Sequence, residues 1–187
     1  PEQTAGVCRA FAQPRPVTPW KVWYSGPNFR YEKPQAGRFR QFDQVGVEVL
    51  GSDDALLDAE VVALGWQFFA RLGLRNVRLV VNSLGDAGDR AAYIETLRTY
   101  LESRSGELSD EARTTLSRNP LRVLDSKRPQ DAVVIAGAPV ISDHLSDDAR
   151  SHFAQVCRAL DVLGIPYVQD DRLVRGLDYY QIGRAHV

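Results

Sequence analysis

Hydrophobic residues follow two different periods in the first half of the chain. Apolar and polar residues alternate along residues 39–50, a pattern typical of a long β-strand. Ser52 and Asp53 follow as favourable N-cap residues, and residues 54–72 then carry apolar side chains at helical spacing up to Gly73. The pattern therefore predicts a strand followed by an amphipathic helix.

Shorter apolar runs predict further strands before and after a mostly helical stretch. Ser109 and Ser146 are favourable caps for two of its helices, and we expect no internal repeat in it. The predicted strands are 22–24, 78–81, 167–168 and a segment near Leu173, the predicted helices are 90–102, 109–116 and 146–163, and residues 133–138 form a short apolar segment. This order predicts an α+β fold in which strands flank a helical block.

The predicted strand 39–50 has two chemically different faces, because successive side chains point to opposite sides. Its odd-numbered face carries Val45, Val47 and Val49 and is expected to pack on a core. The even-numbered face comprises Arg40, Phe42, Gln44, Gly46 and Glu48. Gly46 would let a ligand approach the backbone, although this face also fits the solvated side of an ordinary sheet and the glycine also fits a bulge.

The loop before this strand is rich in cations. Residues 26–40 contain Arg30, Lys33, Arg38 and Arg40 but only one carboxylate, that of Glu32. Guanidinium groups match phosphate oxygens, so the loop is a candidate nucleotide-binding segment, with a charged surface hairpin as the alternative. The chain has no GxxxxGK phosphate loop, and residues 85–88 do not form a dinucleotide fingerprint. A nucleotide would therefore be bound by arginines on strands.

Overall charge and cysteine content disfavour several classes of function. The formal net charge of −1 provides no global basic field for nucleic acid, so such a partner would have to bind a local patch. Cys8 and Cys157 have no CxxC companion, which indicates a reducing, cytoplasmic environment and not a disulfide framework or zinc site. No apolar run approaches the roughly 20 residues needed to cross a bilayer, so we expect no membrane partner.

Four segments of the chain carry recognisable motifs. They are Pro-Glu-Gln-Thr-Ala at 1–5, Gly-Pro-Asn-Phe-Arg-Tyr-Glu-Lys-Pro-Gln-Ala-Gly-Arg-Phe-Arg-Gln-Phe at 26–42, Asn-Pro-Leu-Arg-Val-Leu-Asp-Ser-Lys at 119–127 and Arg-Leu-Val-Arg-Gly-Leu-Asp-Tyr-Tyr at 172–180. The second resembles motif 2 of class II aminoacyl-tRNA synthetases, and the fourth resembles the histidine-binding signature of histidyl-tRNA synthetases. The first and third resemble that family's amino-acid-binding segment and part of the bacterial insertion. The chain is thus similar to bacterial histidyl-tRNA synthetases over residues 1–180.

The resemblance implies an α+β fold with part of the antiparallel class II catalytic sheet and a helical insertion domain. Residues 1–86 would be the partial catalytic core, 87–168 the insertion and 169–180 the return to the core. Residues 181–187 read like translated adapter sequence, so we interpret them as a non-native tail. The family's motif 1, motif 3 and anticodon-binding domain have no counterpart here, so we expect a truncated fragment that is inactive alone.

The same resemblance implies the activity and the partners. The enzyme would activate histidine with ATP, giving histidyl-adenylate with Mg²⁺ on the outer phosphates, and would transfer histidine to tRNA(His) as a cytoplasmic homodimer. One alternative is a paralogue that binds histidine or tRNA without aminoacylation, such as the regulatory subunit of ATP phosphoribosyltransferase. Such paralogues tend to lose the insertion and erode the signature, and both are intact here. Another is an RNA-binding module at 87–168, which the near-neutral charge and the lack of aromatic stacking motifs disfavour.

Roles for individual residues follow from the resemblance alone. Arg30 and Arg175 would be catalytic at the α-phosphate and would also contact histidine. Histidine would otherwise be bound by Glu2, Thr4 and Gln44 at its α-amino group and by Glu48, Tyr179 and Tyr180 at its imidazole, and ATP by Arg30, Glu32, Arg38 and Phe42, with no metal ligand from the chain.

Three residues depart from the family's pattern, and several others are given no functional role. Gln3 replaces a usual glycine, and Asp43 replaces a histidine but would point to the opposite face, so little consequence is expected from the change at Asp43. Asn28 replaces an apolar residue at the loop entrance. His144 and His152 are expected in surface or capping roles, and Trp20, Trp23 and Trp66 in the core or in strand packing.

Overall fold

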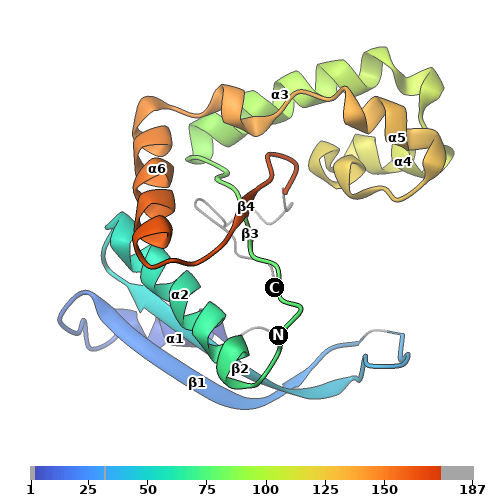
Figure 1. Ribbon diagram of the computed structural model, residues 1–187. Coiled ribbons are helices and arrows are strands. Elements are labelled where there is room, and N and C mark those ends of the chain that lie inside the picture. The colour runs from blue at the N-terminus through green and yellow to red at the C-terminus, as the bar shows by residue number, and fades with distance from the viewer. Residues whose placement is uncertain (1–2, 32, 174–187) are drawn as a thin grey trace. The chain divides into compact units, whose positions relative to one another are not determined.

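The computed structural model describes residues 3–31 and 33–173 as an α+β protein (Figure 1). Contacts divide the chain into two compact units between Leu57 and Asp58. The first unit holds a two-stranded antiparallel hairpin, and the second holds most of the helices together with a short parallel strand pair. The boundaries predicted at residues 86 and 168 remain predictions.

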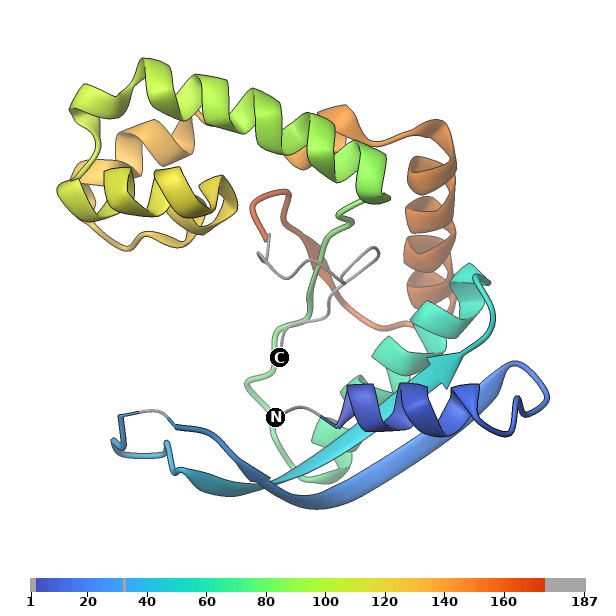
Figure 2. The ribbon, with the colours of Figure 1, turned by 180° about the vertical axis from the view of Figure 1, so that it is seen from behind.

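The first unit consists of helix α1 (Thr4–Ala12) and strands β1 (Trp20–Phe29) and β2 (Gln41–Leu50). The strands pair from Trp20 opposite Leu50 to Phe29 opposite Gln41, and Figure 2 shows α1 beside this hairpin. The sequence predicted β2 well, but β1 is longer than the predicted 22–24 and α1 was not predicted. Pro27 was expected beyond the strand, yet it lies inside β1, where the missing N–H of proline is tolerated at a sheet edge.

The odd-numbered face of the hairpin is its more exposed side, which corrects the expectation that it packs on a core. Val45 is 55% exposed and Trp23 is 74% exposed, while Val47 and Val49 are only partly buried. The even-numbered face is partly covered, because α1 packs against β2. Trp20 behaves as predicted and stacks with Phe11 at 5.7 Å between ring centroids, whereas a packing role for Trp23 is wrong.

The second unit is built around a helical core. Helix α2 (Ala55–Arg71) begins in the first unit and continues into the second. The other elements of the second unit are β3 (Val80–Val81), α3 (Ala87–Ser103), α4 (Asp110–Arg118), α5 (Pro129–Ala136), α6 (Asp147–Val162) and β4 (Val168–Gln169), with 3₁₀ turns η1 (Ser105–Glu107), η2 (Pro120–Asp125) and η3 (Ile141–His144). Tyr93, Leu97 and Leu101 of α3 are buried and pack on Leu108 and Ile141. The apolar segment 133–138 belongs largely to α5, and a turn replaces the strand predicted near Leu173.

Helix starts follow the predicted caps in two places of three. Ser109 and Ser146 are the N-caps of α4 and α6. For α2 the predicted Ser52 and Asp53 are wrong, because Asp54 Oδ1 accepts the Leu56 N–H at 2.9 Å. An aspartate carboxylate satisfies an unpaired first-turn amide as well as a serine does, so the cap lies one residue later.

A short sequence repeat forms the N-terminal ends of α4 and α6, although we expected no internal repeat. The sequence Leu-Ser-Asp-(Glu/Asp)-Ala-Arg occurs at 108–113 and again at 145–150. The first serine donates its N–H and O–H to Asp131 at 2.7 and 2.9 Å, and the second donates both to Asp89 at 2.9 and 3.1 Å. Each serine oxygen then accepts the first-turn amide of its helix, so a buried carboxylate orients the cap.

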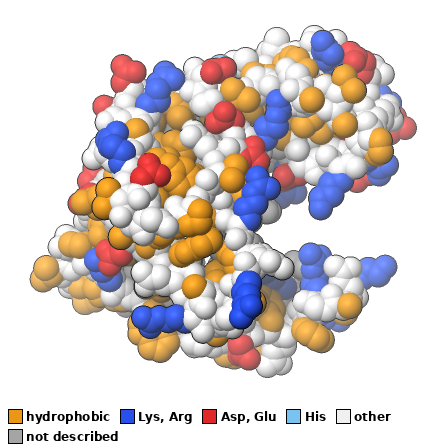
Figure 3. Space-filling model, in the orientation of Figure 1, with side chains coloured by type: hydrophobic (Ala, Val, Ile, Leu, Met, Phe, Trp, Pro, Cys, Tyr) orange, Lys and Arg blue, Asp and Glu red, His pale blue; other side chains and the backbone are white. Residues whose placement is uncertain are grey.

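Charges are mixed over the surface of the helical unit. Figure 3 shows Lys and Arg side chains interspersed with Asp and Glu over this unit. This distribution agrees with the small net charge of −1. Within the described part of the chain, no helix has the length and apolar character required to cross a membrane.

Candidate histidine and nucleotide site

The even-numbered side chains of β2 share one face of the hairpin. Phe42 and Gln44 are half-buried, while Asp43 between them is exposed on the other side. The pairing places Glu48 opposite Val22, whose side chain is also half-buried. The structure therefore brings Phe42, Gln44 and Glu48 to one face, as the alternation predicted.

Glu48 lies at the centre of a hydrogen-bonded cluster on this face. Its Oε1 accepts the Thr4 hydroxyl at 2.6 Å and the Tyr24 hydroxyl at 3.3 Å. Thr4 begins α1 and is 44 residues from Glu48 in the sequence, so the fold joins two predicted histidine-binding residues. A carboxylate has two oxygens with several lone pairs, so Glu48 can also accept an N–H group of a ligand.

Tyr24 is a member of this cluster that the sequence alone did not single out. It pairs with Gly46 across the hairpin, and a Cβ added to Gly46 would lie 2.2 Å from Tyr24 Cζ. We expected Gly46 to leave space for a ligand, but the Tyr24 ring fills that space, so this expectation is wrong. Pairing the two strands across the loop at 30–40 would have placed Tyr24 opposite Gly46 and revealed it.

The Tyr24 hydroxyl is held in its protonated form. Burial raises the pKa of Tyr24 above its ordinary value and the nearby Glu48 carboxylate raises it further, while a hydrogen bond with Thr4 partly offsets both effects. The phenol therefore donates to Glu48 and does not accept from it at neutral pH. Thr4 and Tyr24 thus present two donors to the same carboxylate oxygen.

Arg30 and Phe42 form a second cluster, closer to the tip of the hairpin. The Arg30 guanidinium carbon lies 4.8 Å from the centroid of the Phe42 ring, a cation–π contact. The Arg30 N–H donates to the Arg40 carbonyl at 2.9 Å, which fixes the backbone where the chain leaves β1. A guanidinium beside a half-buried aromatic ring combines the two groups that phosphate and a purine base require.

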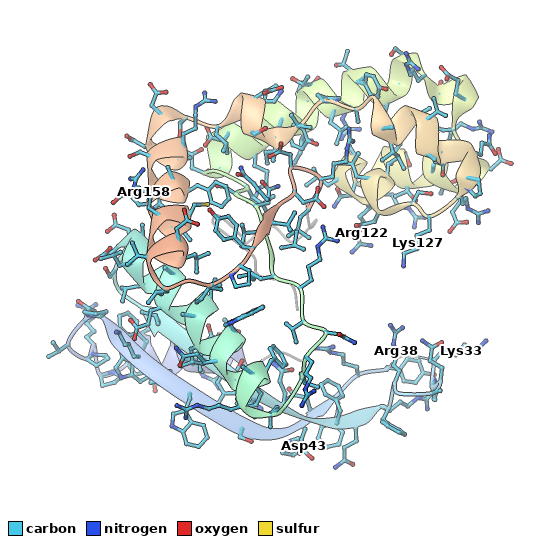
Figure 4. All side chains as sticks on the ribbon, in the orientation of Figure 1. Lys33, Arg38, Asp43, Arg122, Lys127 and Arg158 are labelled. Atoms are coloured by element: carbon cyan, nitrogen blue, oxygen red, sulfur yellow. The ribbon has the colours of Figure 1, made fainter. Side chains whose placement is uncertain are left out.

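Arg38 lies at the tip itself. Gln35 and Arg38 exchange backbone hydrogen bonds of 3.2 and 2.9 Å, and Figure 4 shows Arg38 beside Lys33 at this end of the hairpin. Glu48 is near the opposite end of β2, roughly 20 Å along the strand from Gln41. The site residues are therefore spread along the hairpin in the order tip cations, aromatic ring, amide and carboxylate.

Five predicted site residues lie outside the described residues. They are Glu2, Glu32, Arg175, Tyr179 and Tyr180. Gln3 is described and has φ −81° and ψ −17°, an ordinary right-handed conformation that any residue adopts. The replacement of glycine at this position therefore causes no backbone strain at the start of α1.

His144 and His152, the histidines of the described residues, join no metal-binding group. His152 is largely buried and its Nε2 lies 2.7 Å from Asp58 Oδ2, so it joins α6 to α2 and is not a surface residue. His144 packs beside the Tyr93 ring at 5.6 Å between centroids. Over residues 3–31 and 33–173, no three His, Cys, Asp or Glu side chains are grouped as metal ligands would be.

Comparisons with known proteins agree on one family. The family described as Histidyl-tRNA synthetase matches residues 1–182. The histidine–tRNA ligases of Lactiplantibacillus plantarum and Geobacillus kaustophilus are 51% and 52% identical to this chain over 185 and 184 residues. Each match covers 96% of this chain, which spans 43% of each relative's length.

Solved structures give the same result. Apo S. aureus histidyl-tRNA synthetase superposes with a TM-score of 0.74 at 37% identity, over 99% of this chain and 44% of that one. An ATP phosphoribosyltransferase regulatory subunit/histidyl-tRNA synthetase from Bacillus halodurans has a TM-score of 0.64 at 22% identity, covering 98% of this chain and 52% of that one, and shows the fold alone. The chain belongs to the histidyl-tRNA synthetase family.

Proposed function

We propose that this chain is the part of a histidine–tRNA ligase that binds histidine and ATP. Histidine would be activated by ATP to histidyl-adenylate and then transferred to tRNA(His). The observation that carries the proposal is the hydrogen bond between Thr4 and Glu48, which joins two segments that the resemblance assigns to the same amino acid. The layout along β2 supports it, since the carboxylate and the Arg30–Phe42 pair occupy one face.

Activation requires two anions to meet. A carboxylate oxygen of histidine attacks the α-phosphorus of ATP, and the bond to pyrophosphate breaks. The barrier is largely electrostatic, so fixed cations that contact both anions lower it. We assign Arg30 and Arg175 to the α-phosphate and Arg38 to the outer phosphates, while Phe42 stacks on adenine and Glu32 contacts its edge.

Recognition of imidazole would use Glu48. Neutral imidazole has one N–H donor and one nitrogen acceptor, so a selective pocket needs a partner for each. Glu48 would accept the N–H, replacing one of the two hydroxyl bonds that it now accepts from Thr4 and Tyr24. The released Thr4 hydroxyl, with Gln44 and Glu2, would then bind the α-amino group, while Tyr179 and Tyr180 border the far side of the ring.

The remaining parts of the proposal concern the architecture and the partners. The hairpin would belong to the antiparallel catalytic sheet of a class II synthetase, with residues 87–168 as a helical insertion domain that helps to hold tRNA(His). The full-length enzyme would be a cytoplasmic homodimer.

The donor set fits Mg²⁺ carried by the nucleotide. Magnesium is commonly bound through substrate phosphates with few protein carboxylates, and the described residues contain no acidic group of three. Arg30 and Arg38 would hold the phosphates that carry the ion. When bound, Mg²⁺ supplies neutralising charge at the outer phosphates.

Glu48→Gln tests the site in the full-length protein. The change keeps the shape of the side chain but removes a charge-assisted hydrogen bond worth on the order of 1.5–3 kcal/mol. We therefore expect KM for histidine to rise roughly 10- to 100-fold in histidine-dependent ATP–pyrophosphate exchange. KM for ATP should change little, because the Arg30–Phe42 pair is untouched.

Val47→Ala is the matched control, since adjacent strand residues point to opposite faces. Val47 is only partly buried, so its truncation should cost about 1 kcal/mol or less, read as a small shift in the urea midpoint with normal KM values. If Val47→Ala weakens histidine binding and Glu48→Gln does not, the assigned face is wrong. Histidine binding without any exchange activity in the unsubstituted protein would favour the regulatory paralogue instead.

A further inference from the structure

Backbone hydrogen bonds hold β4 and the turn that follows it. The N–H groups of Val168 and Asp170 donate to the carbonyls of Leu79 and Val81 at 2.9 and 3.1 Å. Beyond β4, Asp170 Oδ1 accepts the Arg172 N–H at 2.9 Å and Asp170 O accepts the Leu173 N–H at 2.9 Å, which closes a tight turn. In Figure 1 this turn, drawn in red, approaches α5.

Arg172 joins this turn to the C-terminal end of α5. Its two terminal nitrogens donate to consecutive backbone carbonyls, Nη1 to Ile135 and Nη2 to Ala136, the latter at 2.6 Å. These carbonyls lie in the last turn of α5, where helices carry partial negative charge, and the Ile135 carbonyl also accepts the Ala138 N–H at 3.2 Å. The last turn of α5 contains no basic residue of its own, so the capping cation comes from a residue 36 positions away.

The backbone next to Arg172 is held from the opposite side. Asn82, which is 3% exposed, donates its side-chain N–H to the Leu173 carbonyl at 3.2 Å. The turn is therefore clamped between the end of β3 and the end of α5. A planar guanidinium that reaches two carbonyls fixes both distance and orientation, which a single-point contact would not do.

We propose that Arg172 is a positioning residue that fixes the start of the histidine-signature segment, at residues 172 and 173, through its bonds to the end of α5. The inference rests on the proposed function, in which Arg175 acts at the α-phosphate only three residues further along the chain. Arg172 itself would touch neither histidine nor ATP. A displacement of about 1 Å in a catalytic group can cost on the order of 100-fold in rate. A turn held in place by Arg172 would therefore influence kcat.

Arg172→Gln in the full-length protein tests this role against simple helix capping. We expect kcat for histidine-dependent ATP–pyrophosphate exchange to fall about 10- to 100-fold, with KM for ATP changed less than about threefold. Arg172→Lys keeps the positive charge but loses the planar guanidinium. Its kcat should lie between those of Arg172→Gln and the unsubstituted protein. All assays are run well below the melting temperature of each variant.

Arg113→Gln is the matched control, because Arg113 also caps carbonyls of the helical unit. Its Nη1 donates to the carbonyls of Leu108 and Ser105 at 2.6 and 3.2 Å, in the turn that precedes α4. We expect a lowered melting temperature in this variant with kcat within about twofold of normal. If Arg172→Gln fails to fold, the lysine variant decides by the same criterion.

Three outcomes would overturn the role of Arg172. One is a normal kcat in the Arg172 variant that folds, and another is an equal loss of kcat in Arg113→Gln. The third is an unsubstituted protein that lacks histidine-dependent exchange, which would overturn the proposed function and this inference with it. If the unsubstituted enzyme and the Arg172 variant have equal histidine-dependent exchange activity, the role of Arg172 is wrong but the proposed function stands.

Discussion

Asp131→Ala should lower the free energy of unfolding by on the order of 3–5 kcal/mol, measured from urea unfolding at neutral pH. Asp131 is fully buried and accepts the Ser109 N–H and O–H at 2.7 and 2.9 Å and the Ser126 O–H at 2.6 Å. Truncation leaves three donors without their acceptor in a buried setting, each worth roughly 1–3 kcal/mol, partly relieved by rotation of the hydroxyls. It also removes the group that orients the α4 cap.

Asp110→Ala is the control for the loss of a carboxylate near the start of the same helix. Asp110 pairs with Arg113, but its side chain is 94% exposed, and such surface pairs contribute little. Its urea midpoint should hardly move. A similar loss for both variants would contradict the role assigned to the buried network.

The stabilisation by Asp131 should also depend on pH. Burial alone would raise the pKa of Asp131, but hydrogen bonds from Ser126 and Ser109 more than offset this and hold the pKa below its ordinary value. The folded state therefore binds the proton less readily than the unfolded state. This contribution is present above the unfolded pKa of about 3.9 and is lost as pH falls through the lower folded pKa. The Asp131→Ala variant should accordingly lose less stability on acidification than the unsubstituted protein.

The carboxylate–serine network shows what local patterns predict and what they leave out. Ser109 and Ser146 were recognisable as caps, because a serine before a helical pattern supplies a local acceptor. Their partners Asp131 and Asp89 lie 22 and 57 residues away, and no local periodicity connects such positions. The six-residue repeat is present in the sequence but is much shorter than the structural units whose repetition defines a fold.

In the hairpin, the sequence predicts which side chains share a face but not which face is buried. Alternation correctly placed Phe42, Gln44 and Glu48 on one side of β2, because the two-residue period is a property of the strand itself. Alternation did not determine which side is covered, since this depends on what packs there. In the structure α1 packs against β2, while Val45 on the apolar side is 55% exposed. Tyr24 was missed for the same reason, because its role depends on the pairing of two strands.

The role proposed for Arg175 is to stabilise negative charge that builds up around the α-phosphorus during the reaction. Histidine carboxylate and ATP each carry negative charge, and as the bond to pyrophosphate lengthens the leaving group gains more. A fixed guanidinium at the α-phosphate stabilises that arrangement more than the separate substrates. Interactions realised only in the transition state raise kcat, whereas those equal in both states change KM. The expected effect of its removal is therefore kinetic.

Arg175→Ala in the full-length protein should lower kcat for histidine-dependent ATP–pyrophosphate exchange by about 10²–10³, a loss on the order of 3 kcal/mol. KM for ATP should rise only modestly, because Arg30 and Arg38 would still hold the phosphates. Arg158→Ala is the control, since Arg158 is an exposed arginine on α6 (Figure 4) and its removal should leave both constants near normal. Initial rates at saturating and limiting ATP separate the two constants. A variant with normal kcat and a raised KM for ATP would show that Arg175 binds the nucleotide without stabilising the transition state.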